Sequence, residues 1–411
     1  MEKKFEFEDL LKNILETLKE SKLPEKIKKD ILNELEEIRS FTLDSRPPRI
    51  AIVGRRGAGK SSLINAIFND YKAATGDVKA QTGRGKWHQY KSDLGELEIL
   101  DTRGLGESDS PEEATDELTP IKELEKSVSE KCPDVILFLS KAKEVGSRID
   151  EDIDQVEELI KVIKSVHEYE VPIVGVVTQV DELTPKKEEP PFTSAIKKRN
   201  IQQAVDELSH KLEKITPYNV TVIPTAAYKM YDDDKITVIE ETIWNIDELL
   251  NFLIEKLPND AQLQLAKISK MKTVQKKLAR KFGKRFSTLC GGIGTIPIPI
   301  ADLPIITGLQ TTMIIIIALI SGRKINKNTV QEFLTALGVN IGVGFALRQV
   351  ARQLVKIIPG AGSAISAAVA SAGTWALCES CIAYFIDDVG IDRAKKTYDT
   401  EFKKRKEEDE N

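Results

Sequence analysis

The segment Gly54–Ser61, which reads GRRGAGKS, decides the fold of this chain. The apolar run Arg49–Val53 before it predicts a buried strand, and Ser62–Ile67 after it predicts a helix. A glycine-rich turn between a strand and a helix presents backbone N–H groups and the helix N-terminus to phosphate. We therefore predict a phosphate-binding P-loop. The residues expected to line it are Gly54, Arg55, Arg56, Gly57, Ala58, Gly59, Lys60, Ser61 and Ser62.

Two residues of this loop and two of an Asp-x-x-Gly motif farther along the chain are suited to bind phosphate and Mg²⁺. Lys60 can reach the β- and γ-phosphates of a nucleoside triphosphate, and the Ser61 hydroxyl can ligate Mg²⁺. The strand candidate 97–100 ends in Asp-Thr-Arg-Gly. Its Asp101 is expected to hold Mg²⁺ through water, and the Gly104 N–H is expected to contact the γ-phosphate.

A threonine between these two motifs completes the predicted metal site. Thr82 precedes the strand-like segment Trp87–Tyr90, and a threonine there can ligate Mg²⁺ while the γ-phosphate is present. Thr75 competes for this role but lies farther from the strand. The predicted metal ligands are Ser61, Thr82 and Asp101.

Guanine selectivity is predicted from the polar end of another apolar strand, 173–177. Asp181 can accept two hydrogen bonds, from N1–H and from the exocyclic amine of guanine, and adenine offers neither. A carboxylate left unpaired against adenine would cost roughly a few kcal/mol. GTP and GDP are therefore the predicted ligands.

Further contacts to the base are expected from residues around two strand ends. Thr178 and Gln179 lie directly before the guanine-binding aspartate. The strand candidate 220–224 ends at Thr225 and Ala226, whose backbone can contact the guanine oxygen. We include all four residues in the predicted nucleotide site.

The order of these motifs resembles the translation-factor class of P-loop GTPases, in the Era-like and dynamin-like neighbourhood. Segments 73–82 and 101–106 are similar to the immunity-related (interferon-inducible) GTPases and their bacterial relatives. The resemblance covers residues 49–257 and implies a Mg²⁺-dependent GTPase with Thr82 as a metal ligand. The chain departs at Arg103, where relatives often have proline, and at Gln179, where small GTPases carry a lysine stacked along the base. We expect loss of that lysine to weaken affinity more than base selectivity.

The residue after the Asp-x-x-Gly motif predicts slow hydrolysis. Ras-type enzymes place a water-orienting glutamine there, whereas this chain has Leu105, which can neither donate nor accept a hydrogen bond. Arg55 and Arg56 are candidates for stabilising the transition state, in cis or across a dimer, and solvated loop arginines are the alternative. The residues assigned to hydrolysis are Lys60, Thr82, Gly104 and Arg56.

The composition describes a foldable protein without an overall nucleic-acid signature. The chain has 411 residues, 41% of them hydrophobic, and a formal net charge of −5. Its first residues are charged, so no secretory signal is expected, and four cysteines suit a reducing cytoplasm. Cys378 and Cys381 have metal- or redox-type spacing, but without a second pair they are predicted to pack a helix.

Three domains are predicted from these patterns. Residues 1–45 read as an N-terminal helical hairpin, broken near Pro24, which must pack on another helical segment to bury its apolar stripes. Residues 46–257 are predicted to form an α/β P-loop GTPase domain with a mostly parallel central sheet. Residues 258–411 are predicted to form an all-α, hydrophobic C-terminal domain.

Two interpretations compete for this C-terminal part. Segment 266–286 holds nine basic and no acidic residues, and Leu303–Gly322 is uncharged, as are 333–347 and 357–378. In the first interpretation, 266–320 meets an anionic membrane surface, and the apolar helices insert. In the second, these helices form a compact core without lipid, as Pro304 and the mean hydropathy of −0.25 favour.

The sequence thus predicts a GTPase that hydrolyses GTP to GDP and phosphate with Mg²⁺ and is switched by nucleotide. We expect it in the cytoplasm, associated with the cytosolic face of a membrane, and in a nucleotide-dependent homodimer or oligomer. The alternative is a soluble Era-like regulatory GTPase acting on ribosome assembly or another protein or RNA complex. Only Phe282 and Phe286 interrupt the basic segment as aromatics, which argues against RNA base stacking without excluding RNA. A structural protein with an inactive site is a third alternative, against which the intact Lys60 and Ser61 argue.

Overall fold

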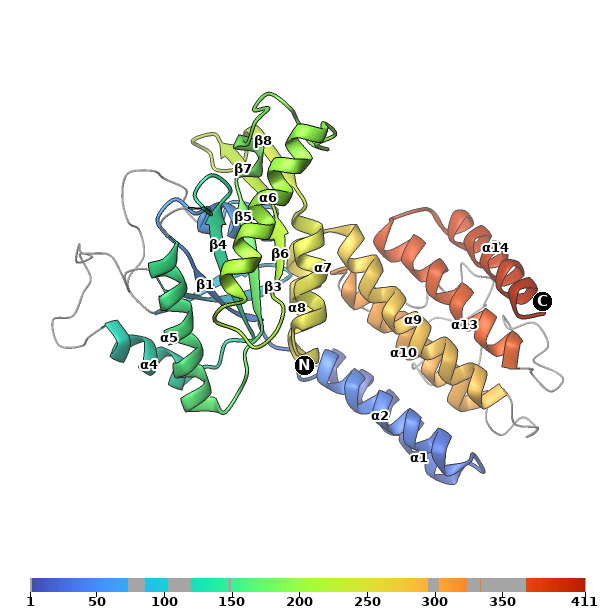
Figure 1. Cartoon of the computed structure of the whole chain (residues 1–411). Helices are drawn as coiled ribbons and strands as arrows, with labels where there is room; N and C mark the ends of the chain where they lie inside the picture. Colours follow the sequence, from blue (N-terminus) through green and yellow to red (C-terminus); the bar gives the residue numbers. More distant parts are fainter. Residues whose placement is uncertain are drawn as a thin grey trace. The chain divides into compact units, whose positions relative to one another are not determined.

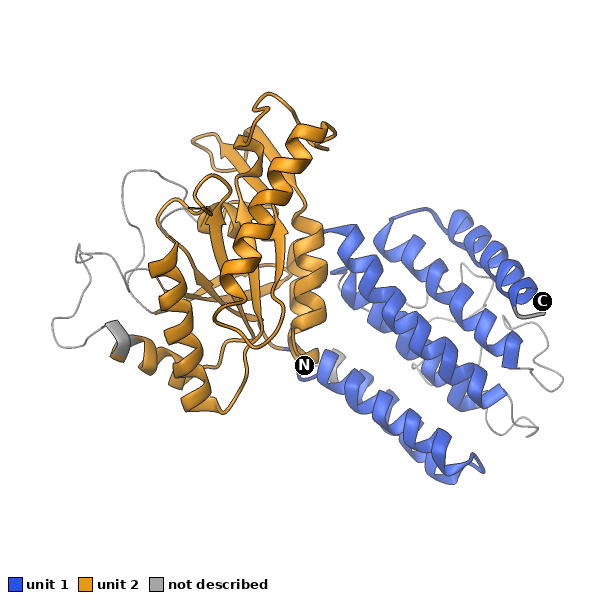
Figure 2. Ribbon diagram, in the orientation of Figure 1, with its two compact units in different colours: residues 1–45, 270–411 blue, residues 46–269 orange. Residues whose placement is uncertain are grey.

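The chain forms two compact units (Figure 2). The computed structural model describes residues 2–72, 86–102, 120–146, 149–294, 303–323, 333 and 367–410. One unit comprises residues 46–269, and the other joins residues 1–45 with 270–411. The sequence predicts a boundary after residue 257, whereas the first of these units continues to Ser269 because its last helix packs on a sheet strand.

The 46–269 unit is built on a six-stranded sheet in the order β2-β3-β1-β4-β5-β6. Only β2 runs antiparallel to its neighbour, so the predicted mostly parallel sheet is confirmed. Strand β1 lies between β3 and β4, and the P-loop therefore leaves the sheet near its centre. The strands are β1 Arg49–Val53, β2 Lys86–Ser92, β3 Gly95–Asp101, β4 Val135–Lys141, β5 Ile173–Thr178 and β6 Thr221–Pro224.

Helices cover both faces of this sheet (Figure 1). Alternate residues of a strand point to opposite faces, and Ala51 and Val53 join one core with α4, α5 and α6. Helices α3, α7 and α8 pack against one another, and α8 also contacts β3. The helices are α3 Lys60–Phe68, α4 Pro120–Glu130, α5 Asp150–His167, α6 Ala195–Leu212, α7 Ile246–Lys256 and α8 Asn259–Ser269.

An antiparallel hairpin was not predicted from the sequence. Strands β7 (Ala226–Tyr231) and β8 (Val238–Trp244) pair as a separate two-stranded sheet. The acidic run 232–234 lies in the turn between them, and Asp234 accepts hydrogen bonds from the backbone of Ile236 and Thr237. The exposed, glutamate-containing β8 lacks the apolar alternation that identifies a strand in a sequence.

The other unit is helical, as predicted for the C-terminal part. Helix α10 is buried along nearly its whole length and contacts α1, α9 and α13, so it forms the centre of this unit. Residues 334–366, which include most of two predicted apolar stretches, lie outside the described residues. The described elements are α1 Glu2–Glu20, α2 Glu25–Thr42, α9 Lys272–Gly294, α10 Leu303–Ile320, α13 Ala367–Cys381, a π-helical turn Ile382–Ile386, and α14 Ile391–Glu410.

The N-terminal hairpin packs on helices of this unit, α1 on α10 and α2 on α9. The Phe41 and Phe282 rings have centroids 4.6 Å apart. The Arg285 guanidinium on α9 lies 2.9 Å from a Glu34 carboxylate oxygen and 2.7 Å from one of Glu37, both on α2. Apolar packing and ion pairing thus join segments from the two ends of the chain.

The apolar helices of this unit are largely enclosed by it. Among the described residues, one continuous helical segment, Ala367–Ile386, has the length and composition to cross a membrane, and 67% of its apolar window is buried inside the protein. Within α13, Cys378 and Cys381 are buried, as packing residues are, and burial raises the pKa of both thiols.

Much of the positive charge of α9 is matched inside the unit. Lys276 lies 2.6 Å from an Asp387 carboxylate oxygen, and Arg280 lies 2.7 Å from one of Glu379. Part of the basic segment 266–286, which could otherwise bind lipid or RNA, therefore joins α9 to the C-terminal part of this unit.

Close contact between α9 and α13 makes one glycine sensitive to substitution. A Cβ added at Gly283 would lie 2.2 Å from Cys378 Sγ, whereas at Gly292 on the same helix no described atom beyond its chain neighbours and the nearby helix backbone comes within 4 Å of an added Cβ. We expect Gly283→Ala to destabilise the protein by about 1–3 kcal/mol through overpacking. Gly292→Ala should stabilise it by about 0.5–1 kcal/mol because alanine favours a helix. Urea unfolding followed by circular dichroism measures both, and equal shifts would contradict the described packing.

Candidate nucleotide-binding site

The P-loop runs from the end of β1 to the start of α3, as predicted. Gly57 and Gly59 have φ angles of 75° and 91°, which favour glycine. A Cβ at Gly54 would lie 2.5 Å from the Leu139 carbonyl oxygen of β4. The loop can therefore follow this path only with glycines at these positions.

Two charged groups of the predicted phosphate and metal chemistry meet beside the loop. Lys60 Nζ donates a hydrogen bond to the Gly54 carbonyl and lies 3.8 Å from Asp101 Oδ1. Both side chains are buried, at 5% and 9% exposure. Ser61 follows Lys60 in the first turn of α3 and is half-buried. The structure thus brings the predicted lysine and aspartate together.

Some predicted site residues lie outside the described part of the chain. These are Thr82, its competitor Thr75, Gly104, Arg103 and Leu105. Their roles as metal ligand, γ-phosphate contact and hydrolysis-limiting residue stay predictions.

The two P-loop arginines differ in their surroundings. Arg55 Nε donates a 2.8 Å hydrogen bond to Asp152, and a second guanidinium nitrogen lies 3.3 Å from Glu151. Both carboxylates belong to the first turn of α5. Arg56 is exposed. Arg55 is thus held by the first turn of α5.

Residues at the end of β5 hold the predicted base-binding segment against the P-loop. Thr178 Oγ1 donates to the Ala58 carbonyl at 2.9 Å. Gln179 has a left-handed φ of 56°, and its Nε2 donates to the Gly57 carbonyl at 2.8 Å. The two predicted halves of the nucleotide site are therefore joined by direct hydrogen bonds.

Asp181 stands in a 3-10 turn, Val180–Glu182, directly after these contacts. Burial raises the pKa of its carboxyl, and the side chain remains partly exposed. Thr225, directly after the end of β6, supports the turn because its carbonyl accepts the Val180 N–H at 3.3 Å. Thr225 and Ala226, whose backbone is predicted to contact the guanine oxygen, are both buried.

A buried lysine that the sequence did not single out fixes the loop after Asp181. Lys197 is fully buried, and its Nζ donates to the Asp181 and Leu183 carbonyls, each at 2.6 Å. The ammonium also lies 4.7 Å from the centroid of the Phe192 ring. Desolvation lowers the pKa of Lys197. No local pattern marks this role, because a lysine in the first turn of an amphipathic helix is ordinarily solvated.

Comparison with known proteins agrees with this geometry. Residues 49–179 match the family described as 50S ribosome-binding GTPase. A 96-residue segment is 29% identical to GTPase Der of Neisseria meningitidis, covering 23% of this chain and 20% of Der. A 264-residue match to the tRNA modification GTPase MnmE of Streptococcus suis is 24% identical and covers 63% of this chain and 49% of MnmE. The chain thus spans half or less of these two relatives.

The family match covers the P-loop and strands β1 to β5 and ends at Gln179, before Asp181. The 46–269 unit has the P-loop GTPase fold, and part of it is similar in sequence to the GTPases Der and MnmE. A further relative, the Escherichia coli protein YkfA, is 23% identical over 301 residues, which cover 71% of this chain and 91% of YkfA. That match is longer than the GTPase domain alone.

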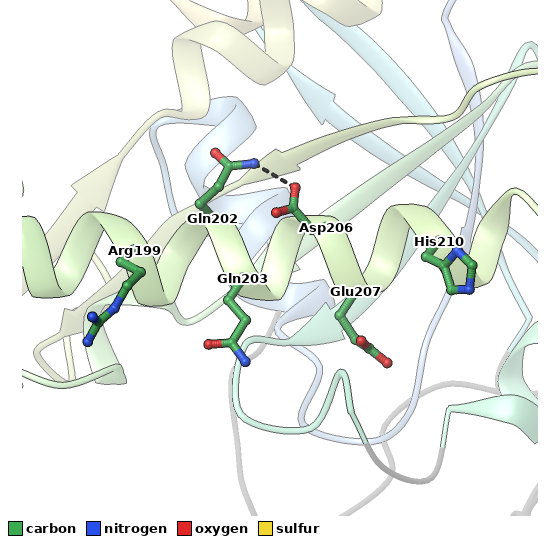
Figure 3. A pocket seen from close by; sticks show the side chains of 6 residues that line it. All are labelled: Arg199, Gln202, Gln203, Asp206, Glu207 and His210. Atoms are coloured by element: carbon green, nitrogen blue, oxygen red, sulfur yellow. Dashed lines mark hydrogen bonds between the residues drawn. The ribbon is translucent and has the colours of Figure 1, made fainter.

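A surface hollow elsewhere on the GTPase domain is not part of this site. Its lining residues all belong to α6, and Gln202 and Asp206 hydrogen-bond to each other along the helix at 2.8 Å (Figure 3). The hollow contains no P-loop or base-binding residue. Its lining is Arg199, Gln202, Gln203, Asp206, Glu207 and His210.

We expect Lys197→Met to lower both stability and guanine-nucleotide affinity. The substitution removes hydrogen bonds from a charged donor to buried carbonyls, a loss of about 3 kcal/mol, and it frees the loop that positions Asp181. Lys198→Met is the matched control, because Lys198 is the exposed neighbour on the same helix. Nucleotide titration and thermal unfolding of both variants measure the effect, and equal behaviour of the two would contradict the role given to Lys197.

Proposed function

We propose that this protein binds GTP with Mg²⁺ and hydrolyses it to GDP and phosphate, acting as a nucleotide-dependent switch. The observation that carries the proposal is the convergence of two motifs on one loop. Lys60 and Asp101 meet at one side of it, and Thr178 and Gln179 hydrogen-bond to its backbone. This arrangement joins a phosphate site to a base site that favours guanine.

The side chains present fit a magnesium ion. Asp101 offers a buried carboxylate, and Ser61 offers a hydroxyl from the first turn of α3, which are oxygen ligands of the kind that Mg²⁺ takes. Bound Mg²⁺ would neutralise charge on the β- and γ-phosphate oxygens. Lys60 contributes a further positive charge, and the loop N–H groups orient the phosphates. Asp181 selects the base by accepting hydrogen bonds that only guanine donates.

The expected intrinsic rate is low. Leu105 supplies no water-orienting group, and Arg55 is engaged by Asp152 and Glu151. We therefore propose that self-association or a partner completes the hydrolytic site, and the transition-state role predicted for Arg56 from the sequence belongs to this proposal. Turnover per molecule that rises with protein concentration would support this, and constant turnover would contradict self-association.

For the helical unit, we propose peripheral contact with an anionic membrane on the cytosolic side. Lys277, Lys281 and Lys284 are exposed and share one face of α9, at positions i, i+4 and i+7. Each lysine near such a surface contributes about 1 kcal/mol. The burial of α10 favours contact over insertion. As part of the same proposal, the protein is related to the immunity-related, dynamin-like GTPases. The alternative is a soluble protein that acts on a protein or RNA complex.

Vesicle flotation separates these alternatives. We expect the protein to float with anionic vesicles and not with neutral ones, and replacement of all three lysines by glutamine to reduce flotation. Sedimentation with RNA in place of vesicle binding would support the alternative and contradict the membrane proposal.

The hydrolysis proposal is tested by phosphate release from GTP. Lys60→Ala should lower turnover about 100-fold or more, because a positive charge on the transferred phosphoryl group is lost. Asp181→Asn should instead change base selectivity toward xanthosine triphosphate, whose C2 carbonyl can accept a hydrogen bond from the asparagine amide. Unchanged turnover in Lys60→Ala would show that the activity arises elsewhere.

A further inference from the structure

A second lysine lies against the P-loop from the end of β4. A Cβ added at Gly57 would be 3.2 Å from Lys141 Nζ and 3.3 Å from its Cε. Lys141 is the last residue of β4, so its backbone is fixed by the sheet while its side chain reaches the loop. None of the motifs in the sequence includes this residue.

The register of the sheet places this lysine beside the base-binding segment. Lys141 is paired with Thr178 across β4 and β5, and the residue after Thr178 is Gln179. Gln179 donates to the Gly57 carbonyl, and Lys141 Nζ lies against the same glycine. A neutral side chain and a charged one thus converge on one P-loop residue.

The charge of Lys141 is only loosely matched by the protein. Its Nζ lies 3.1 Å from Glu144 Oε1, with side-chain exposures of 28% for the lysine and 47% for the glutamate. A partly exposed ion pair of this kind contributes little to stability. The ammonium can therefore exchange this carboxylate for an anionic ligand at little cost. The neighbouring Lys143 pairs instead with Glu182 at 2.7 Å.

We propose that Lys141 is a nucleotide-binding residue that supplies, from β4, the positive charge absent at Gln179. Its ammonium attracts the phosphate groups of the guanine nucleotide at the Gly57 side of the loop. The inference rests on the proposed function, because it requires the nucleotide to occupy this loop. It also predicts that affinity depends on a residue outside the P-loop and base motifs.

A charge-relocation experiment tests this assignment. We expect Lys141→Gln to weaken binding of a fluorescent GDP analogue about tenfold, the effect of losing one charged hydrogen bond. Gln179→Lys introduced into that variant should restore most of the affinity, giving a strongly non-additive double-mutant cycle. The salt dependence of binding should fall in Lys141→Gln and return in the double variant.

Three controls make the outcome decisive. Lys141→Arg should retain affinity, and Glu144→Gln should bind as tightly as the unaltered protein or more tightly, because a competing carboxylate is removed. Thermal unfolding of each variant separates a binding effect from a folding defect, and loss of affinity in Lys141→Arg with unchanged stability would contradict a charge role. Unaltered affinity in Lys141→Gln, or no restoration by Gln179→Lys, would overturn the role given to Lys141 and leave the proposed function standing. Failure of the unaltered protein to bind any guanine nucleotide would overturn the proposed function as well.

Discussion

The nucleotide site depends on the contact between the P-loop and the ends of β4 and β5. Gly54 lies so close to the Leu139 carbonyl that no side chain fits, and Thr178 Oγ1 bonds the Ala58 carbonyl. Because the loop is held from two strands, its backbone N–H groups have a fixed direction before any ligand binds. Preorganised donors of this kind are effective in stabilising charge on a phosphate. The same contacts position the turn Val180–Glu182, which contains Asp181.

Much of the fold and part of the site could be predicted from the sequence. Lys60, Asp101 and the central parallel sheet follow from motifs whose residues are close together or whose strands are apolar. The contacts of Arg55 with Asp152, and of Lys197 with the Asp181 loop, could not be predicted. The first contact joins residues 97 positions apart in the sequence, and the second joins residues 16 positions apart. Charged residues are ordinarily exposed, and no local periodicity indicates such pairings. Strand β8 was missed for a related reason, since its side chains are mostly exposed.

The helical unit shows why apolar length alone does not identify a membrane span. Helix α10 carries no charged residue and is buried by protein along nearly its whole length, as expected for a helix at the centre of a helical core. Likewise, the number of basic residues in helix α9 does not by itself identify a surface that binds lipid or RNA. Arg280 and Arg285 meet carboxylates from segments distant in sequence, so a linear count of lysines and arginines overstates the charge available to lipid or RNA.

The central claim is that this loop binds guanine nucleotide selectively with Mg²⁺. Isothermal titration of the purified protein with Mg²⁺-GTP and Mg²⁺-ATP tests it most directly. The account predicts that GTP binds about 100-fold or more tightly than ATP, because Asp181 is left unpaired against adenine. Equal affinities for the two nucleotides, or no binding of either, would contradict it.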